Sequence, residues 1–92
     1  MNNYRQKPDG LTPRIRQEYK ALNVPCLEPP GGVGCDFIVF RGGSVRFIEV
    51  KDPAERDRLT KAEQRLRSLA GDLYIIVTTL DEALVAAGWM PE

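Results

Sequence analysis

Hydrophobic and polar positions follow several different periods along the chain, and each period predicts one kind of element. Over residues 13–22 the apolar side chains recur every three or four positions, which is typical of an amphipathic helix. Thr12 precedes a proline at the first helical position and therefore fits an N-cap. Residues 1–11 are polar and hold a turn signal, so we expect a flexible arm. The stripe of the helix consists of Ile15, Tyr19 and Leu22.

Two short runs in the middle of the chain have the composition of β-strands. Residues 36–40 and 45–50 are rich in Val, Ile and Phe, and a Gly-Gly pair lies between them. Such a pair between β-rich runs indicates a two-residue hairpin. The Pro- and Gly-rich residues 23–34 ahead of them indicate a loop or an irregular extended lead-in.

The last third of the chain predicts a helix, a strand and a final helix. Thr60 and Glu63 have the spacing of a capping box, and Gly71 ends the helix that follows. Residues 73–77 are continuously apolar, which is typical of a strand buried on both faces. A second Thr-x-x-Glu pattern precedes a helix over residues 80–87. We expect an α/β fold of order α-β-β-α-β-α, with a mixed three-stranded sheet flanked by helices. The apolar stripe of the helix that begins after Thr60 comprises Ala62, Leu66, Leu69 and Ala70.

Composition restricts the chemistry available to the chain. Its 92 residues include 13 basic and 13 acidic side chains and no histidine. This excludes Cys/His zinc sites and Ser-His or Cys-His catalytic pairs. Acid–base or metal chemistry then depends on Asp, Glu and Lys, which suits a hard cation such as Mg²⁺. We expect Cys26 and Cys35 to be free thiols in a reducing compartment.

Length and hydropathy predict the organisation of the chain. Residues 1–92 suit one small domain. No apolar stretch approaches the roughly 20 residues that cross a bilayer, and the N-terminus lacks the apolar segment of a signal peptide. We therefore expect a cytoplasmic protein without a membrane partner. Because the net charge is zero, any surface for nucleic acid must be local.

The predicted hairpin brings charged side chains together. With residues 42–43 as its loop, the pairing runs back from the turn until Asp36 lies opposite Glu49. Lys51 is two positions beyond Glu49 and therefore shares its face. Two carboxylates about 5 Å apart repel one another unless a divalent cation lies between them. The backbone carbonyl of Val50 supplies another hard oxygen beside them. This face indicates metal-dependent phosphodiester hydrolysis, with the lysine near the phosphate or the attacking water.

Each of these residues also has a plainer interpretation. A Glu-x-Lys pair on the solvent face of a strand is commonly a surface salt bridge. A single aspartate after a glycine-rich stretch is commonly a turn residue. A loop longer than two residues would also shift the register.

The motifs, taken in order, resemble those of a known nuclease family. They are the lead-in PPGGVGCDFIVF, the turn RGG, the strand VRFIEVKDP, the helix start RLTKAEQ and the segment YIIVTTLDEAL. This order resembles the virus-type replication-repair nuclease (VRR-NUC) domain of the PD-(D/E)xK nuclease superfamily, over about residues 12–88. The resemblance implies one VRR-NUC-like domain with a restriction-endonuclease-like core. One position departs from the pattern, because Cys35 stands where the family usually has proline.

The resemblance also implies roles for the charged residues. Asp36 and Glu49 would be metal ligands, with the Val50 carbonyl beside them. Lys51 would orient or activate the attacking water and stabilise charge on the phosphate. The implied cation is Mg²⁺, for which Mn²⁺ would substitute, with no small-molecule cofactor.

Two further positions follow from the family pattern. A glutamate on the first helix is often near the metal, and Glu18 is the match, as a second-metal or outer-shell residue. A catalytic glutamine near the start of the helix after the lysine strand corresponds to Gln64. The spacing equally aligns Glu63 with that position.

The implied function is a structure-selective DNA endonuclease that hydrolyses phosphodiester bonds. Stand-alone viral or prophage members are homodimers that resemble Holliday-junction resolvases, so branched DNA and the host cytoplasm are expected. Whether a four-way junction or a flap is preferred stays open. The alternatives are a non-catalytic nucleic-acid-binding or assembly module with the same fold and, ranked lower, a sequence-specific nuclease. A homodimer interface is expected at Leu84, Val85, Trp89 and Met90.

Basic residues around the candidate site are expected to hold DNA through its phosphates. Such contacts position DNA without reading its sequence, and they weaken with salt. Several are interleaved with acidic residues, which is also typical of a solvated helix face. The candidate DNA-binding residues are Arg14, Lys20, Arg56, Arg58, Lys61 and Arg65.

Overall fold

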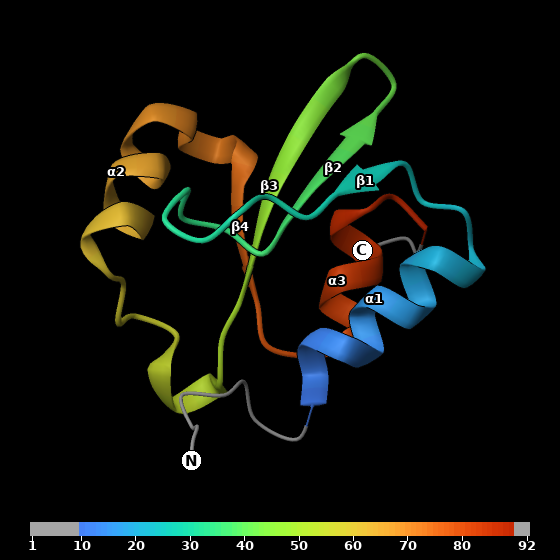
Figure 1. Ribbon diagram of the computed structural model, residues 1–92, viewed down its shortest axis with the longest axis horizontal. Helices are drawn as coiled ribbons and strands as arrows, with labels where there is room; N and C mark the ends of the chain where they lie inside the picture. Colours follow the sequence, from blue (N-terminus) through green and yellow to red (C-terminus); the bar gives the residue numbers. More distant parts are fainter. Residues whose placement is uncertain (1–9, 90–92) are drawn as a thin grey trace.

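The computed structural model describes residues 10–89, which form three layers. In Figure 1 the sheet lies in the middle, with α1 and α3 on one side and α2 on the other. The α/β class expected from the sequence is therefore confirmed. The elements are α1 (Leu11–Ala21), β1 (Cys26–Leu27), β2 (Phe37–Arg41), β3 (Ser44–Val50), η2 (Pro53–Glu55), α2 (Lys61–Ala70), η3 (Gly71–Leu73), β4 (Tyr74–Val77) and α3 (Leu80–Ala86).

The sheet has four strands in the order β1-β2-β3-β4, not the three that were expected. The additional strand is β1, whose Cys26 and Leu27 pair with Val39 and Ile38. It lies in the lead-in that was predicted to be a loop, and two residues are too few to show a period-2 pattern. β1 and β3 both run antiparallel to β2, whereas β4 runs parallel to β3, so the sheet is mixed.

The hairpin register predicted from the Gly-Gly pair is confirmed. Its pairs run from Arg41 with Ser44 to Phe37 with Ile48. Gly42 has a φ of 48° and the next glycine one of 84°. Two consecutive positive φ angles suit a two-residue hairpin turn that follows the twist of its strands.

The main core lies between the sheet and the α1/α3 layer. Ile15 and Tyr19 of α1 are buried, which confirms two members of the predicted stripe. The Tyr19 ring meets the Phe37 ring edge to face, with centroids 5.4 Å apart. Its hydroxyl donates a 2.7 Å hydrogen bond to the Ala83 carbonyl, which ties α1 to α3. The sheet contributes Phe37, Val39, Ile48, Val50 and Val77 to this core.

The start of α1 differs from the expectation. The helix begins at Leu11, and its N-cap is Gly10 in a left-handed conformation. Thr12, expected as the N-cap, lies in the first turn, and its Oγ1 is buried with no hydrogen-bond partner among the described residues. Residues 10 and 11, which were expected to belong to the flexible arm, are thus the N-cap and the first residue of α1. The other residues of the expected arm, 1–9, lie outside the residues that the structure describes.

The capping box that begins α2 is confirmed. The Thr60 hydroxyl accepts from the Glu63 N–H, and the Glu63 carboxylate accepts from the Thr60 N–H. The expected apolar stripe, however, is wrong at Leu69, which is 77% exposed. No residue of α2 is fully buried, although Ala62 and Leu66 lie against Gly34 of the lead-in.

The C-terminal elements are shorter than predicted. Leu73 belongs to η3, so β4 begins at Tyr74. Because β4 is an edge strand, its two middle residues are half-buried rather than buried on both faces. Thr79 caps α3 as expected by accepting from the Glu82 N–H, and the Glu82 carboxylate accepts from the Thr78 N–H as well as from the Thr79 backbone. Within residues 10–89, no helix is both long and apolar enough to span a membrane.

Candidate functional site

Asp36 lies at the end of the hairpin, where the ladder between β2 and β3 stops. Its N–H donates to the Ile48 carbonyl over 2.8 Å, so the expected sixth pair with Glu49 is not formed as a regular ladder pair. Instead its Oδ2 accepts a 2.8 Å hydrogen bond from the Val50 N–H. The Asp36 carboxylate therefore reaches across to the last residues of β3, which is the proximity that the sequence predicted.

Glu49 and Lys51 share a face at the end of β3. The Lys51 Nζ lies 3.7 Å from Oε2 of Glu49. Glu49 is 2% exposed, and among residues 10–89 it is the only charged residue that is buried. A buried carboxylate requires nearby compensation, since removing its charge from water is costly. The plainer interpretation of these two residues as an exposed surface salt bridge therefore does not hold.

Glu63 joins this group from α2. Its Oε1 lies 2.8 Å from Lys51 Nζ, closer than Glu49, and also accepts a 2.9 Å hydrogen bond from the Thr60 N–H. Burial by itself would raise the pKa of Glu63. The hydrogen bonds from Lys51 and Thr60, the charge of Lys51 and a hydrogen bond with the Glu49 side chain outweigh burial and hold the pKa below its ordinary value.

Gln64 faces elsewhere. Its side chain is exposed, and its amide donates a 2.8 Å hydrogen bond to the Leu59 carbonyl. Of the two residues that matched the family position, the structure brings Glu63 to Lys51. The capping-box signal located Glu63 at the helix start, but a capping pattern contains no information on what else the carboxylate contacts.

Tyr74, the first residue of β4, interacts electrostatically with the acidic group and was not singled out from the sequence. Burial raises its pKa most, and the negative charges of Glu49, Glu63 and Asp36 raise it further. Its hydroxyl donates a 2.8 Å hydrogen bond to the Gly34 carbonyl. The phenol therefore lies within electrostatic reach of all three carboxylates and holds the segment that leads to Asp36. Its only sequence signal was membership in an apolar strand.

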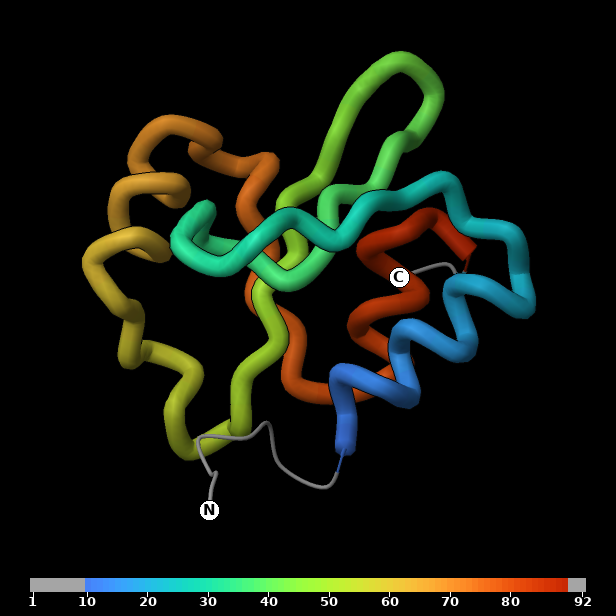
Figure 2. Tube along the Cα trace, viewed as in Figure 1, coloured from blue at the N-terminus to red at the C-terminus, as the bar shows by residue number. Residues whose placement is uncertain are grey.

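The lead-in to Asp36 packs tightly against α2. Figure 2 shows the chain after β1 crossing in front of the sheet, turning beside α2 and then entering β2. Gly34 has a φ of +110°, and a Cβ there would lie 2.5 Å from the Ala62 carbonyl oxygen. Cys35, which stands in place of the family's proline, is buried, and burial together with Glu49 and Asp36 raises its pKa to about 11. Cys26 and Cys35 are both free, as expected.

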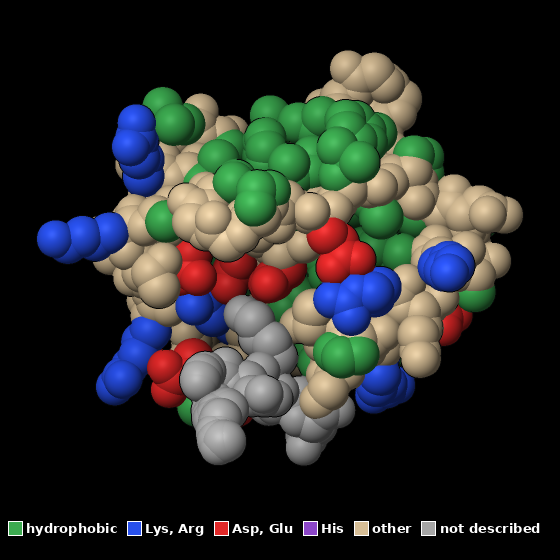
Figure 3. Space-filling view, viewed as in Figure 1, with side chains coloured by type: hydrophobic (Ala, Val, Ile, Leu, Met, Phe, Trp, Pro, Cys, Tyr) green, Lys and Arg blue, Asp and Glu red, His purple; other side chains and the backbone are tan. Residues whose placement is uncertain are grey.

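The surface at the site is acidic and recessed. Figure 3 shows acidic side chains in a row across a depression in the middle of the displayed face, below a rim that carries an apolar patch. Glu49 and Glu63 contact Lys51, and both of them, together with Asp36, act electrostatically on Tyr74.

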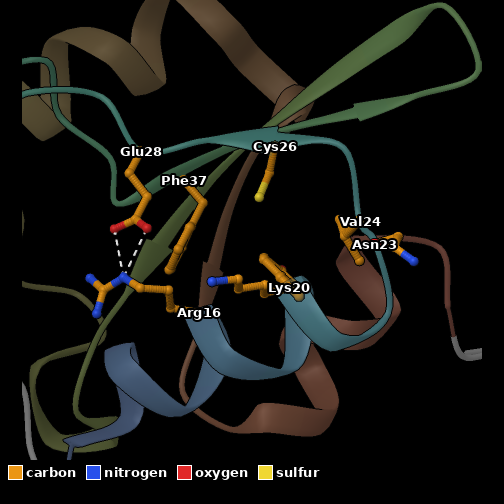
Figure 4. A pocket seen from close by; sticks show the side chains of 8 residues that line it. Arg16, Lys20, Asn23, Val24, Cys26, Glu28 and Phe37 are labelled. Atoms are coloured by element: carbon orange, nitrogen blue, oxygen red, sulfur yellow. Dashed lines mark hydrogen bonds and ion pairs between the residues drawn. The ribbon is translucent and has the colours of Figure 1, made fainter.

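A cavity of about 490 Å³ opens between α1 and β1. Figure 4 shows Arg16 and Lys20 extending from α1 and the Cys26 thiol pointing toward the same space from β1. The Arg16 Nε donates to both carboxylate oxygens of Glu28, at 2.9 and 2.8 Å. That hydrogen bond is the main cause of a raised Arg16 pKa, to which Asp36 also contributes. The cavity therefore lies within electrostatic range of the acidic group.

Glu18 is half-buried on α1, and no hydrogen bond or ion pair within residues 10–89 connects it to Lys51. Its role as a second-metal or outer-shell residue stays a prediction.

The candidate DNA-binding residues fall into separate groups. Arg14 and Lys20 are exposed on α1, whereas Lys61 and Arg65 are exposed on α2 beside a hollow of about 330 Å³. Two others form ion pairs, with Nη1 of Arg56 3.7 Å from Oε1 of Glu82 and Nε of Arg58 3.9 Å from Oε1 of Glu55. The basic side chains are thus distributed on both sides of the sheet.

The donor set suits a hard divalent cation only in part. In residues 10–89 no three Asp, Glu or Cys side chains are arranged to hold one ion. A cation would therefore be held by the Asp36 and Glu49 carboxylates with the Val50 carbonyl, and its remaining ligands would come from water or substrate, as is usual for Mg²⁺. Glu49 and Glu63 share the single ammonium of Lys51, and the Asp36 carboxylate lies at the end of the same strand, so a divalent cation would also offset the excess of negative charge.

Comparisons of the chain with protein-family models, with curated proteins and with solved structures find no match. Membership of the VRR-NUC family therefore stays a prediction from the ordered motifs.

Proposed function

We propose that the protein is a metal-dependent, structure-selective DNA endonuclease that hydrolyses phosphodiester bonds. The observation that supports this most is the meeting of Asp36, Glu49 and Lys51 at one end of the hairpin. Oδ2 of Asp36 accepts from the Val50 N–H at 2.8 Å, and Lys51 Nζ lies 3.7 Å from Glu49. Carboxylate ligands beside an ammonium are suited to a reaction in which negative charge increases on a phosphate.

Mg²⁺ or Mn²⁺, when bound, would supply the Lewis acidity that polarises the phosphoryl oxygen. The Asp36 and Glu49 carboxylates and the Val50 carbonyl would hold it. Lys51 would donate to a non-bridging phosphate oxygen, and its ammonium would exchange the Glu63 contact for that phosphate. Glu63 would keep Lys51 oriented before substrate arrives, at the family position that matched either Gln64 or Glu63.

Branched DNA is the proposed substrate, and a homodimer resembling Holliday-junction resolvases is the proposed form. The basic residues on both sides of the sheet would contact phosphates of more than one arm, without reading bases. A preference for DNA shape with a strong salt dependence is then expected.

A second candidate function is a non-catalytic nucleic-acid-binding or assembly module. The observation that favours it is the close Lys51–Glu63 ion pair at 2.8 Å, together with the lack of a three-carboxylate metal group in the described chain. A lysine that had lost its catalytic role and was neutralised by the carboxylate of Glu63 would have the same geometry.

The experiment that separates the two candidates is cleavage of a labelled four-way junction and of a flap, with EDTA, Mg²⁺ or Mn²⁺. The first proposal expects cutting that needs the metal and falls at least about 100-fold in Lys51→Ala, the scale of a lost charge-stabilising donor. Binding without cutting in every metal supports the second. Cleavage that is unchanged both by EDTA and by Lys51→Ala would overturn the first proposal.

A further inference from the structure

The outer edge of β4 is open within residues 10–89. The strand order places β4 at the end of the sheet, where it pairs with β3 alone. Its residues Tyr74–Val77 contain no proline and no charged side chain. Proteins usually protect an edge with such residues, a bulge or a covering segment, because an unpaired edge is a template for another strand.

The backbone of Ile76 points toward this open edge. The Val77 carbonyl accepts a 2.9 Å hydrogen bond from the Lys51 N–H, so its polar groups face β3. Successive residues of a strand direct their N–H and C=O groups to alternate sides, so those of Ile76 face outward. Thr78 also faces outward, but its N–H already donates to Oε1 of Glu82. The N–H available for pairing in the middle of the edge is therefore that of Ile76.

A cavity of about 510 Å³ follows the same edge. Ile75, Ile76 and Val85 line it and are half-buried. Arginines line the end of the cavity near Tyr74. Tyr74 pairs with Phe47 of β3, and Arg46 directly precedes Phe47. The other end, where β4 leads into α3, is acidic. The first end carries Arg41 and Arg46 with Asp72, and the second carries Asp81 and Glu82 with Arg56, whose Nη1 lies 3.7 Å from Oε1 of Glu82. The first end therefore has an excess of one positive charge and the second an excess of one negative charge.

We propose that β4 pairs antiparallel with β4 of a second copy of this chain, about a two-fold axis at Ile76. The two Ile76 residues would exchange N–H···O=C hydrogen bonds, and Ile75, Ile76 and Val85 would form the apolar centre. Antiparallel pairing reverses the second copy, so that its acidic end meets the arginine end of the first. A surface that is complementary to itself in this way is what a two-fold interface requires.

This dimer would place both candidate sites on one face of a continuous eight-stranded sheet. Glu49 is the β3 neighbour of Ile76 on that face. With strands about 4.8 Å apart, the two Glu49 residues would be separated by three strand spacings, roughly 14 Å. The assembly does not depend on the proposed nuclease function, but with it two cuts in one branched molecule become possible. Of the interface expected from the sequence, Val85 is included, whereas Met90 lies outside the described residues.

Dimerisation is tested without DNA or metal. A negative result would therefore count against the dimer and not against the nuclease proposal. Light scattering on a sizing column should give the mass of two 10.3 kDa chains for the wild type. Ile76→Lys should give one chain with an unchanged circular dichroism spectrum. Leu69→Lys is the matched control, because Leu69 is also apolar but lies on α2, 77% exposed, and it should stay dimeric.

Charge reversal provides a test that does not alter the apolar centre. Asp81→Arg and Arg46→Glu should each weaken dimerisation about tenfold, because each creates a like-charge contact across the axis. The double variant should restore it. In a background of Cys26→Ala and Cys35→Ala, Ile76→Cys should form an intermolecular disulfide on oxidation, and Leu69→Cys should not.

Three outcomes would overturn the proposal. The first is a wild-type monomer at all concentrations, and the second is a folded Ile76→Lys, Asp81→Arg or Arg46→Glu variant that dimerises like the wild type. The third is a monomer that becomes dimeric when residues 1–9 are deleted, which would mean that this segment occupies the edge.

Discussion

The Lys51 ammonium lies 2.8 Å from Glu63 and 3.7 Å from Glu49, so one cation serves two carboxyl groups from different elements. The three side chains are 12%, 13% and 3% exposed. Solvent therefore screens this contact far less than it screens an ordinary surface pair. The arrangement joins the end of β3 to the start of α2, a helix with no fully buried residue.

Replacing Lys51 by methionine should destabilise the protein at neutral pH. The substitution leaves Glu49 and Glu63 without their cation, and the free energy of unfolding should fall by about 3 kcal/mol. Adding Glu63→Gln should recover part of this loss, because one unpaired carboxylate is then removed. Urea denaturation of the two single variants and the double variant measures the coupling. A double variant no more stable than Lys51→Met would contradict it.

Acidification should remove the stabilisation that Glu63 provides. The pKa of Glu63 in the folded protein is below its ordinary value of 4.5. The contribution is therefore present above about pH 4.5 and is lost as the pH falls through the lower folded pKa, because the unfolded chain then binds a proton that the folded protein does not.

Glu63→Gln is the matched control for this pH dependence. Its amide oxygen can still accept from the Thr60 N–H, but it does not titrate. The stability advantage of the wild type over Glu63→Gln should therefore shrink between pH 5 and pH 3, as followed by thermal unfolding at several pH values. An advantage that is constant over this range would show that Lys51 does not hold Glu63 ionised.

Much of the site could be predicted because its signals are local. The Gly-Gly pair set the hairpin register, and the register brought Asp36 to β3 beside Glu49. Glu63 and Tyr74 could not be recognised in the same way. Their contacts with Lys51 and Gly34 join residues 12 and 40 positions apart, and no short pattern encodes such a distance.

Tertiary packing also accounts for the errors in the fold. Leu69 has helical spacing but is exposed, whereas Ala62 and Leu66 on the same helix lie against Gly34. β1 forms because Cys26 and Leu27 are held against β2, although the stretch around them is rich in proline and glycine. In both cases the neighbouring residues in the folded protein determined whether the segment was exposed or paired, and the hydrophobic pattern of the sequence contains no information on those neighbours.

The close approach of Gly34 to α2 predicts that a single methyl group will be destabilising there. Gly34→Ala would place a Cβ 2.5 Å from the Ala62 carbonyl oxygen, at a φ of +110°. A loss of about 2 kcal/mol is expected from overpacking and backbone strain. Gly31→Ala is the control, since a Cβ at Gly31 meets nothing within 4 Å. It should change stability by less than about 0.5 kcal/mol. Equal effects in the two variants would mean that the lead-in does not pack on α2 as described.

The Asp36 carboxylate has a structural and a chemical task that substitution can separate. Its Oδ2 accepts from the Val50 N–H at 2.8 Å, where the ladder between β2 and β3 has stopped. Asn at this position keeps an oxygen acceptor but carries no charge. Asp36→Asn should therefore stay within about 1 kcal/mol of the wild type, whereas Asp36→Ala should lose about 1 to 3 kcal/mol through the unsatisfied N–H.

The chemical task should be lost in both variants. If Asp36 is a ligand, millimolar Mg²⁺ or Mn²⁺ should raise the melting temperature of the wild type but not of Asp36→Asn, because only a site that binds in the folded state stabilises it. Cleavage of branched DNA should fall at least about 100-fold in the same variant. A folded Asp36→Asn protein that keeps both the metal response and the cleavage rate would exclude Asp36 from the site, even with its hydrogen bond to β3 intact.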